Sequence, residues 1–168
     1  RALRTFEHFD AFKVGDVVVG GFGWQEIGLS DGGGGLRRVD ASKVPMQAFL
    51  GVAGMPGLTA YAGLLRVAAL KPGDVVFVSA ASGAVGSLVC QIAKIKGHKV
   101  IGSAGGAEKI RFLKEELGVD EAIDYKAEPD LTAALARVAP EGIDVYFENV
   151  GGAHLEAALN AANPFARF

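Results

Sequence analysis

The sequence predicts an α/β fold built around a doubly wound parallel sheet that is incomplete in this chain. From residue 75 onward, short apolar runs rich in β-branched residues alternate with segments of helical periodicity. Glycines stand where predicted helices end, at Gly97 and Gly118, as left-handed C-terminal caps require. Strands that alternate with helices of this length are typical of right-handed βαβ units, which place parallel strands side by side.

The composition is that of a soluble globular protein with a sizeable core. Half of the 168 residues are apolar, 21% are charged, and the net charge is −2. Because there is no long basic run, neither nucleic acid nor an anionic membrane surface is expected as a partner. The 24 glycines are scattered among periodic segments, which excludes collagen-like and low-complexity classes. No apolar run approaches the roughly 20 residues of a membrane span.

The chain contains a single cysteine, Cys90. One cysteine excludes an intrachain disulfide framework and a multi-cysteine metal cluster. Cys90 lies in an apolar helical pattern, so we expect a buried structural thiol rather than a nucleophile. The first residues lack the apolar core of a signal peptide, which makes the cytoplasm the expected location.

Residues 1–43 are expected to be the end of a β-rich domain. Short β segments are predicted at 17–19, 22–27 and 36–39, with a flexible break at 31–35. A helical pattern then begins at Val44 and continues to Ala69. Apolar residues recur at helical spacing on one face of this segment: Leu58, Tyr61, Ala62, Leu65 and Ala69. The turn at 71–74 ends it, and residues 44–168 are assigned to a second domain.

The second domain is expected to alternate strands and helices to its end. Strands are predicted at 75–79, 99–103, 122–124 and 143–147, and 165–168 begins a further one. Helices are predicted at 84–96, 107–117, 131–138 and 152–161. In the first of these helices, Val85, Leu88, Val89 and Ile92 share a single face.

The loop after the first of these strands has the features of a dinucleotide phosphate loop. Aligned on the G-x-G-x-x-G fingerprint, residues 81–86 keep the second glycine at Gly83 and the third at Gly86, and have Ala81 in place of the first. Gly83 would let the backbone approach a pyrophosphate, and Gly86 would let the helix pack closely on the sheet. The helix N-terminus offers free N–H groups to the anion. The alternative is a small-residue turn that needs no ligand.

The end of the second strand indicates which nucleotide fits. An NAD site usually places a carboxylate there for the ribose 2′-hydroxyl. Here the strand ends in Ser103-Ala104-Gly105-Gly106, and no acid precedes Glu108. Lys109 and Arg111 follow on the next helix, and an ammonium group suits a 2′-phosphate. NADPH is therefore preferred over NADH, the alternative being that Lys109 is a solvated surface lysine, unpaired or paired with Glu108.

These features, with their flanks, resemble the medium-chain dehydrogenase/reductase superfamily, and within it the zinc-independent branch of prostaglandin, 2-alkenal and curcumin reductases. The residues that carry the resemblance are Phe22-Gly23-Trp24-Gln25-Glu26, Met55-Pro56-Gly57-Leu58-Thr59-Ala60-Tyr61, Ala80 to Gly86, Gly105-Gly106-Ala107-Glu108-Lys109 and Glu148-Asn149-Val150-Gly151-Gly152. The resemblance implies hydride transfer from NADPH to the β-carbon of an α,β-unsaturated ketone or aldehyde. It also implies that 1–43 is a remnant of a GroES-like substrate domain and that 44–168 is an NADP-binding Rossmann domain truncated at its C-terminus.

The resemblance also implies roles for individual residues. The expected cofactor contacts are Gly83, Ala84, Val85 and Gly86 at the pyrophosphate, Lys109 at the 2′-phosphate, Tyr125 at the adenosine end, Asn149 after the fourth strand, and Thr59 near the nicotinamide. Structural alternatives remain open for three of them. Tyr125 could pack a loop, Asn149 could serve the turn before Gly151, and Thr59 could be a helix-start hydroxyl.

No metal site and no catalytic residue are predicted. The region 20–40, where the zinc alcohol dehydrogenases of the superfamily carry a cysteine-rich lobe, has no cysteine, and His8, His98 and His154 show no ligand spacing. The family's tyrosine near the substrate carbonyl comes after the last residue of this chain, so the catalytic acid stays unknown. The parent enzyme is expected to be a homodimer acting on a small enone or enal. The alternatives are a quinone oxidoreductase of the same superfamily and a non-catalytic NADPH-binding module.

Overall fold

The computed structural model describes residues 11–23, 25–32 and 35–168, which form two compact units divided between Met55 and Pro56. The predictions for His8 and Trp24, and part of the predicted break at 31–35, fall outside the described residues. None of the described helices is long and apolar enough to span a bilayer.

In the first unit, β1 (Val18–Val19) and β2 (Arg37–Arg38) form an antiparallel pair. Both lie inside predicted segments. The prediction of a β segment at 22–27 is wrong for the described residues, which form bends and loop there. The physical reason is local: the Phe22 N–H donates to Gly20 O, and the Gln25 side-chain amide donates to Phe22 O, so these groups are satisfied without a partner strand. A 3₁₀ helix, Met46–Leu50, follows.

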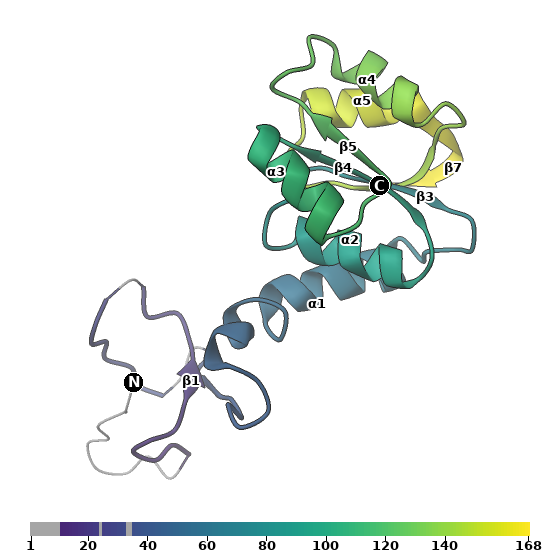
Figure 1. The fold of residues 1–168 in the computed structure, drawn as a ribbon. Helices are drawn as coiled ribbons and strands as arrows, with labels where there is room; N and C mark the ends of the chain where they lie inside the picture. Colours follow the sequence, from purple (N-terminus) through teal and green to yellow (C-terminus); the bar gives the residue numbers. More distant parts are fainter. Residues whose placement is uncertain (1–10, 24, 33–34) are drawn as a thin grey trace. The chain divides into compact units, whose positions relative to one another are not determined.

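The second unit is a parallel five-stranded sheet with helices on both faces (Figure 1). Its helices are α1 (Met55–Ala62), α2 (Gly86–Ile95), α3 (Ala107–Arg111), α4 (Leu131–Val138) and α5 (Ala153–Ala161). Its strands are β3 (Val75–Val78), β4 (Lys99–Ala104), β5 (Glu121–Asp124), β6 (Ile143–Phe147) and β7 (Ala162–Arg167). π-helical segments continue α1 over Gly63–Val67 and α3 over Phe112–Glu116.

The strand order is β5-β4-β3-β6-β7, with every neighbouring pair parallel. The chain runs outward from β3 to β5 on one side, then returns and runs outward through β6 on the other. Val76 of β3 therefore pairs with Val100 of β4 and with Val145 of β6. This reversal at β3 is the topological switch point at which open α/β sheets bind ligands, beyond the carboxyl ends of the strands. The predicted Rossmann-type fold is confirmed.

Two apolar layers hold the helices to the sheet. One lies between the sheet and α1, α2 and α3 and contains Val78, Val89 and Cys90; the other lies between the sheet and α4 and α5 and contains Phe77. Successive residues of β3 thus serve opposite faces, as the period of a strand requires. Cys90 is fully buried, and burial raises the pKa of its thiol to about 12, which confirms the structural role expected for it.

Most predicted elements are confirmed, but the helical pattern predicted from Val44 contains only a 3₁₀ helix before α1 begins at Met55. The last strand also differs in its start. β7 begins at Ala162 rather than at Phe165, so it includes Pro164. A proline is tolerated there because β7 is an edge strand: its open side has no neighbouring strand, so no N–H is needed there for a hydrogen bond. The Asn163 side chain donates to Asp144 Oδ1 at 3.0 Å and secures the start of the strand.

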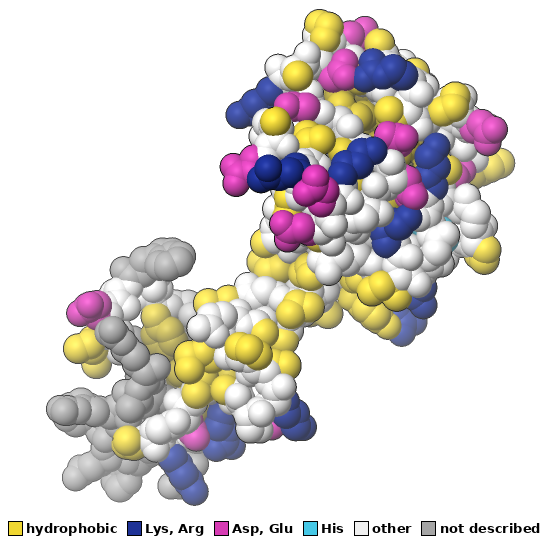
Figure 2. Space-filling model, in the orientation of Figure 1, with side chains coloured by type: hydrophobic (Ala, Val, Ile, Leu, Met, Phe, Trp, Pro, Cys, Tyr) yellow, Lys and Arg dark blue, Asp and Glu magenta, His cyan; other side chains and the backbone are white. Residues whose placement is uncertain are grey.

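The buried face of α1 and its continuation differs from the face with the most apolar side chains. The structure buries Ala60, Leu64 and Ala68, whereas Leu58 and Tyr61 are exposed. The small side chains of Ala60 and Ala68 let the helix lie close to the sheet, since tight packing rewards fit rather than hydrophobicity alone. Figure 2 shows hydrophobic side chains gathered over α1 on the second unit, and basic and acidic side chains interspersed over the rest of that face.

Aspartates tie neighbouring strands of the sheet together. Asp120 accepts the Val100 N–H at 2.6 Å and pairs with Lys94 at 2.8 Å, and Asp144 accepts the Val75 N–H at 2.8 Å. Burial alone would raise the pKa of Asp120, but Lys94 and the Val100 N–H outweigh it and hold this pKa below its ordinary value. Burial would also raise the pKa of Asp144, but hydrogen bonds from the Val75 N–H and the Asn163 side chain outweigh burial and keep this pKa below its ordinary value.

These lowered pKa values predict how stability depends on pH. A carboxyl whose pKa is lower in the folded chain contributes stability that is complete above its unfolded pKa, about 3.9 for Asp, and is lost as the pH falls through the folded value. We therefore expect the free energy of unfolding in urea to be constant near neutral pH and to decline below about pH 4. Asp120→Asn should lower stability at neutral pH and make the acid decline shallower. Stability that is unchanged down to pH 3 would contradict this reasoning.

Candidate cofactor-binding site

The carboxyl ends of the central strands are joined side by side at one edge of the sheet. The Ala81 N–H, after β3, donates to Ser103 O of β4 at 2.9 Å. The Tyr125 N–H, after β5, donates to Ala104 O of β4 at 3.2 Å. On the other side of β3, the Asn149 N–H donates to the Ser79 hydroxyl at 2.9 Å. The loops that carry most of the predicted site residues therefore meet at the switch point.

The β3–α2 loop turns one residue earlier than the fingerprint alignment suggests. Ala80, not Ala81, has the left-handed backbone, with φ +45°. Ala81 is instead fully buried, and its side chain lies 3.0 Å from where a Cβ on Gly102 would stand. The left-handed residue of the turn is therefore the one before the position that aligns with the first glycine of the motif. Ala81 is small because β4 passes directly beside it.

Gly86 brings the start of α2 into contact with the loop. A Cβ added to Gly86 would lie 2.4 Å from Ala80 O and 2.9 Å from Ala81 Cα, which confirms the close approach predicted for this glycine. Gly83 is exposed at the tip of the loop, and its N–H donates to Ala80 O at 2.8 Å.

The first N–H groups of α2 are available to a ligand. Ala84 is exposed and Val85 half-buried. The backbone N–H groups of Ala84, Val85 and Gly86 donate to no acceptor among the described residues. Such a set of amides at a helix start, with the positive end of the helix dipole, suits a pyrophosphate.

The β4–α3 loop leaves room for two side chains from the β5 end. A Cβ on Gly105 would stand 2.9 Å from Tyr125 Oη and 2.8 Å from Lys126 Cε, so a larger residue there would displace the ends of these two side chains. Asp124 accepts the Gly106 N–H at 2.9 Å and the Lys126 N–H at 3.1 Å, which fixes this arrangement. The N–H of Gly106 is also the main reason that the pKa of Asp124 lies below its ordinary value.

Lys109 lies exposed on α3, and among the described residues it forms no ion pair, with Glu108 or with any other acid. Tyr125 is 41% exposed, and its ring packs edge-on against His154, with centroids 5.1 Å apart. Lys109 and Tyr125 thus flank the β4 end, where sequence analysis found no carboxylate for a ribose 2′-hydroxyl. Lys126 was missed, although its position directly after Tyr125 was a usable signal.

Asn149 and Thr59 lie toward the β6 side of the switch point. The Asn149 side-chain amide donates to Ser79 O at 2.8 Å, so this residue does more than serve a local turn. Thr59 is exposed on α1, one turn before Gly63, where an added Cβ would stand 2.7 Å from the Phe147 ring at the end of β6. Residues four apart share a helix face, so Thr59 lies on the face that meets β6.

The residues described here do not fit a zinc ion. His98 Nδ1 bonds to Asp74 O at 3.2 Å, and His154 Nε2 bonds to the Ser103 hydroxyl at 2.9 Å. Both imidazoles are buried and committed to these contacts, and Cys90 lies in the apolar layer beneath α2. Within the described ranges, no group of three His, Cys, Asp or Glu side chains is placed to hold a metal.

Comparison with known proteins places this geometry in a family. Residues 84–168 match the family described as zinc-binding dehydrogenase. The NADP(+)-dependent 2-alkenal reductase of Nicotiana tabacum is 52% identical over 148 residues, which are 88% of this chain and 43% of the relative. Prostaglandin reductase 1 of Rattus norvegicus is 48% identical over 160 residues, 94% of this chain and 48% of the relative.

A solved structure supports the same family assignment. The crystal structure of CurA in complex with NADPH from Vibrio vulnificus has 49% sequence identity and a TM-score of 0.83, covering 94% of this chain and 46% of that one. The chain spans about half the length of the curated relatives described above.

Proposed function

Because this chain belongs to the zinc-binding dehydrogenase family, in the NADPH-dependent reductase branch of the medium-chain dehydrogenase/reductase superfamily, we propose that it is the cofactor-binding part of an enone reductase. The enzyme would use NADPH to reduce the C=C bond of α,β-unsaturated ketones or aldehydes and leave the carbonyl intact. The observation that carries the proposal is that two groups suited to NADPH follow neighbouring parallel strands: the N–H groups of 84–86, which have no acceptor among the described residues, come after β3, and Lys109, which no described acid pairs with, comes after β4.

The residues present fit NADPH by their chemistry. In this proposal the N–H groups of Ala84, Val85 and Gly86 bind the pyrophosphate, with Gly83 leaving space at the loop tip. Lys109 neutralises the 2′-phosphate, since a charged hydrogen bond to phosphate is among the strong ones. When bound, NADPH would supply a hydride for the β-carbon of the substrate.

The other predicted residues divide between the two halves of the nucleotide. Tyr125 packs at the adenosine end, with Lys126 as a second cation there. Asn149 and Thr59 lie on the other side of β3 and would contact the nicotinamide half. None of these groups is assigned the role of catalytic acid, and no step is routed through zinc, because the described side chains do not fit that metal.

The proposal extends to the parts of the chain outside the nucleotide site. Residues 1–43 would belong to the GroES-like substrate domain, and 44–168 to the NADP-binding domain. The substrate would be a small enone or enal, and the parent enzyme a cytoplasmic homodimer. A lone, fully buried thiol in Cys90 is in keeping with a reducing compartment.

The proposal is tested by mixing the protein that contains this chain with NADPH and a panel of 2-alkenals, enones and quinones. We expect NADPH absorbance to fall with the enones and enals, and mass spectrometry to find the saturated carbonyl compound. If NADPH were oxidised only in the presence of quinones, the protein would be assigned to the quinone oxidoreductases instead. Tight NADPH binding without turnover of any compound would make it a non-catalytic binding module.

A further inference from the structure

The loop between β6 and α5 is shaped by the Glu148 carboxylate. Glu148 Oε1 accepts the N–H groups of Val150 at 2.5 Å and of Gly151 at 2.8 Å. The backbone of Gly151 and Gly152 that follows is left-handed, with φ +76° and +54°, so the chain reverses sharply there. One carboxylate oxygen therefore closes the turn that leads from the end of the sheet into α5.

Ser79 connects this turn to the phosphate loop. Its hydroxyl accepts the Asn149 N–H at 2.9 Å and points to Glu148 Oε1 at 3.3 Å, while its carbonyl accepts the Asn149 side-chain amide at 2.8 Å. Ser79 directly precedes Ala80, whose left-handed backbone starts the phosphate loop. The two loops are thus held together through one serine, although the residues lie 69 and 70 positions apart in sequence.

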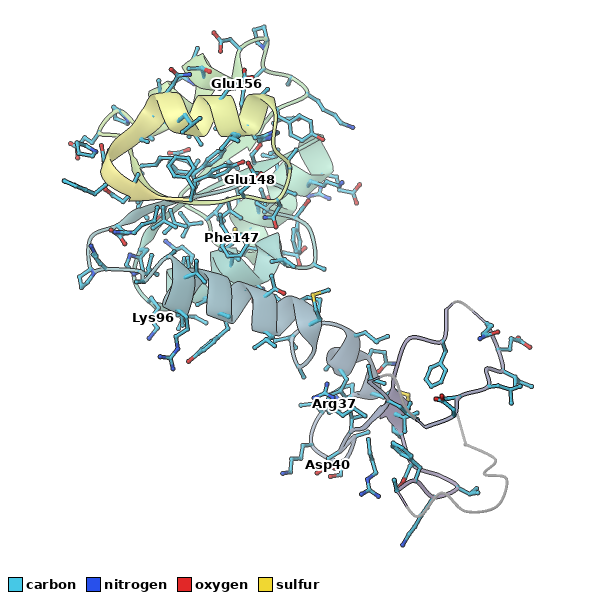
Figure 3. All side chains as sticks on the ribbon, turned by 180° about the vertical axis from the view of Figure 1, so that it is seen from behind. Arg37, Asp40, Lys96, Phe147, Glu148 and Glu156 are labelled. Atoms are coloured by element: carbon cyan, nitrogen blue, oxygen red, sulfur yellow. The ribbon has the colours of Figure 1, made fainter. Side chains whose placement is uncertain are left out.

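Glu148 is a half-buried residue whose side chain lies on the α5 side of the sheet, opposite to Phe147 (Figure 3). Burial alone would raise the pKa of Glu148, but the N–H groups of Val150 and Gly151, with Tyr146 and Ser79, outweigh burial and keep this pKa below its ordinary value. Its second oxygen, Oε2, is buried without a hydrogen-bond partner among the described residues. A buried carboxylate oxygen without a partner is costly in a fold, which argues that the turn needs the hydrogen bonds that the other oxygen accepts.

The hydrogen bonds around Glu148 and Ser79 determine how Asn149 is presented to a ligand. Its side-chain N–H₂ is engaged by Ser79 O, and the residue itself is exposed, so its Oδ1 is left to accept a bond from a ligand. Asn149 lies on the β6 side of β3, whereas Lys109 and Tyr125 lie on the β4–β5 side. Since a dinucleotide binds across the switch point, the β6 side receives the half that does not carry the 2′-phosphate.

We infer that Glu148 is a positioning residue that acts with Ser79 to clamp the β6–α5 loop to the phosphate loop and so presents Asn149 Oδ1 to hydroxyl or amide donors of the nicotinamide half. This inference rests on the proposed function, because it requires NADPH as the ligand. It assigns Glu148 no contact with the reacting atoms. It predicts that loss of the carboxylate affects one half of the nucleotide and spares the other.

The test compares two ligands on the protein that contains this chain. Isothermal titration calorimetry gives Kd for NADPH and for adenosine 2′,5′-bisphosphate, which lacks the nicotinamide half. We expect Glu148→Ala to raise Kd for NADPH about tenfold, the scale of one lost charged hydrogen bond, and to leave Kd for the bisphosphate within about twofold. Ser79→Ala should likewise raise Kd for NADPH and leave Kd for the bisphosphate nearly unchanged.

Control variants separate positioning from general damage. Glu148→Gln keeps an acceptor oxygen and the side-chain shape, so it should restore much of the NADPH affinity even if the alanine variant folds poorly. Glu156→Ala removes an exposed carboxylate from α5 and should change neither ligand (Figure 3).

Other outcomes would overturn the inference. Equal loss of both ligands in Glu148→Ala and Glu148→Gln, or no loss of NADPH affinity in either, would show that the carboxylate does not position the nicotinamide side. A wild-type protein that binds neither ligand would overturn the proposed function and the inference together.

Discussion

Gly86→Ala is expected to raise Kd for NADPH about a hundredfold, because overpacking a close contact costs about 1–3 kcal/mol and each tenfold in Kd is about 1.4 kcal/mol. The new methyl group would lie 2.4 Å from Ala80 O and 2.9 Å from Ala81 Cα. Both atoms belong to the backbone, so no side-chain rotation can relieve the contact. The phosphate loop itself must move away from the start of α2.

A compensating effect is present but smaller. Alanine favours a helix over glycine by up to about 1 kcal/mol, and Gly86 is the first residue of α2. This gain in helix stability is smaller than most of the range of the overpacking cost. Binding of NADPH should therefore weaken even if the melting temperature changes little. The measurement is NADPH titration beside thermal unfolding.

Gly21→Ala is a matched control for this substitution, because a Cβ at Gly21 would meet nothing within 4 Å. It should leave both NADPH affinity and the melting temperature near their wild-type values. If Gly86→Ala also left NADPH affinity unchanged, the β3–α2 loop would not be the pyrophosphate site.

Lys109→Ala is expected to weaken NADPH about ten- to a hundredfold, the range of a charged hydrogen bond worth about 1.5–3 kcal/mol. NADH should be almost unaffected, because it lacks the 2′-phosphate that Lys109 would neutralise. The prediction rests on an exposed ammonium that no described acid pairs with, on the helix that follows Gly105, over which the ends of the Tyr125 and Lys126 side chains lie. Kd for each nucleotide is measured on the same preparation.

Lys96→Ala is the matched control, because it removes the same charge from the same unit. Lys96 is exposed at the C-terminal end of α2, which lies at the opposite edge of the sheet from the phosphate loop. It should weaken neither nucleotide. A loss that is equal for NADPH and NADH in Lys109→Ala would contradict the 2′-phosphate role.

The sequence was informative wherever a structural feature depends on nearby residues. Apolar periodicity correctly predicted α4 at 131–138 and β6 at 143–147, because amphipathic spacing and flanking turn residues lie within the segment itself. The same is true of the caps at Gly97 and Gly118, whose φ values are +82° and +65°. Only glycine adopts such a backbone readily, so its place in the sequence identifies the helix end.

The sequence was less informative about which face of an element is buried. For α1 the apolar residues Leu58 and Tyr61 suggested a face, yet the structure buries Ala60 and Leu64 on another. A helical pattern counts apolar side chains, whereas burial depends on how closely the partner surface approaches. Here the Phe147 ring meets Gly63, so small residues mark the contact.

By itself the sequence determined the alternation of strands and helices, the glycine loop of 81–86, and the basic Lys109 after the second strand, because each is written in consecutive residues. Only the tertiary structure decided that Ala80 makes the turn, that Lys126 lies over Gly105, and that Ser79 joins Glu148 and Asn149. These depend on strands that become neighbours through crossovers, and pairing between distant segments leaves no local pattern to detect.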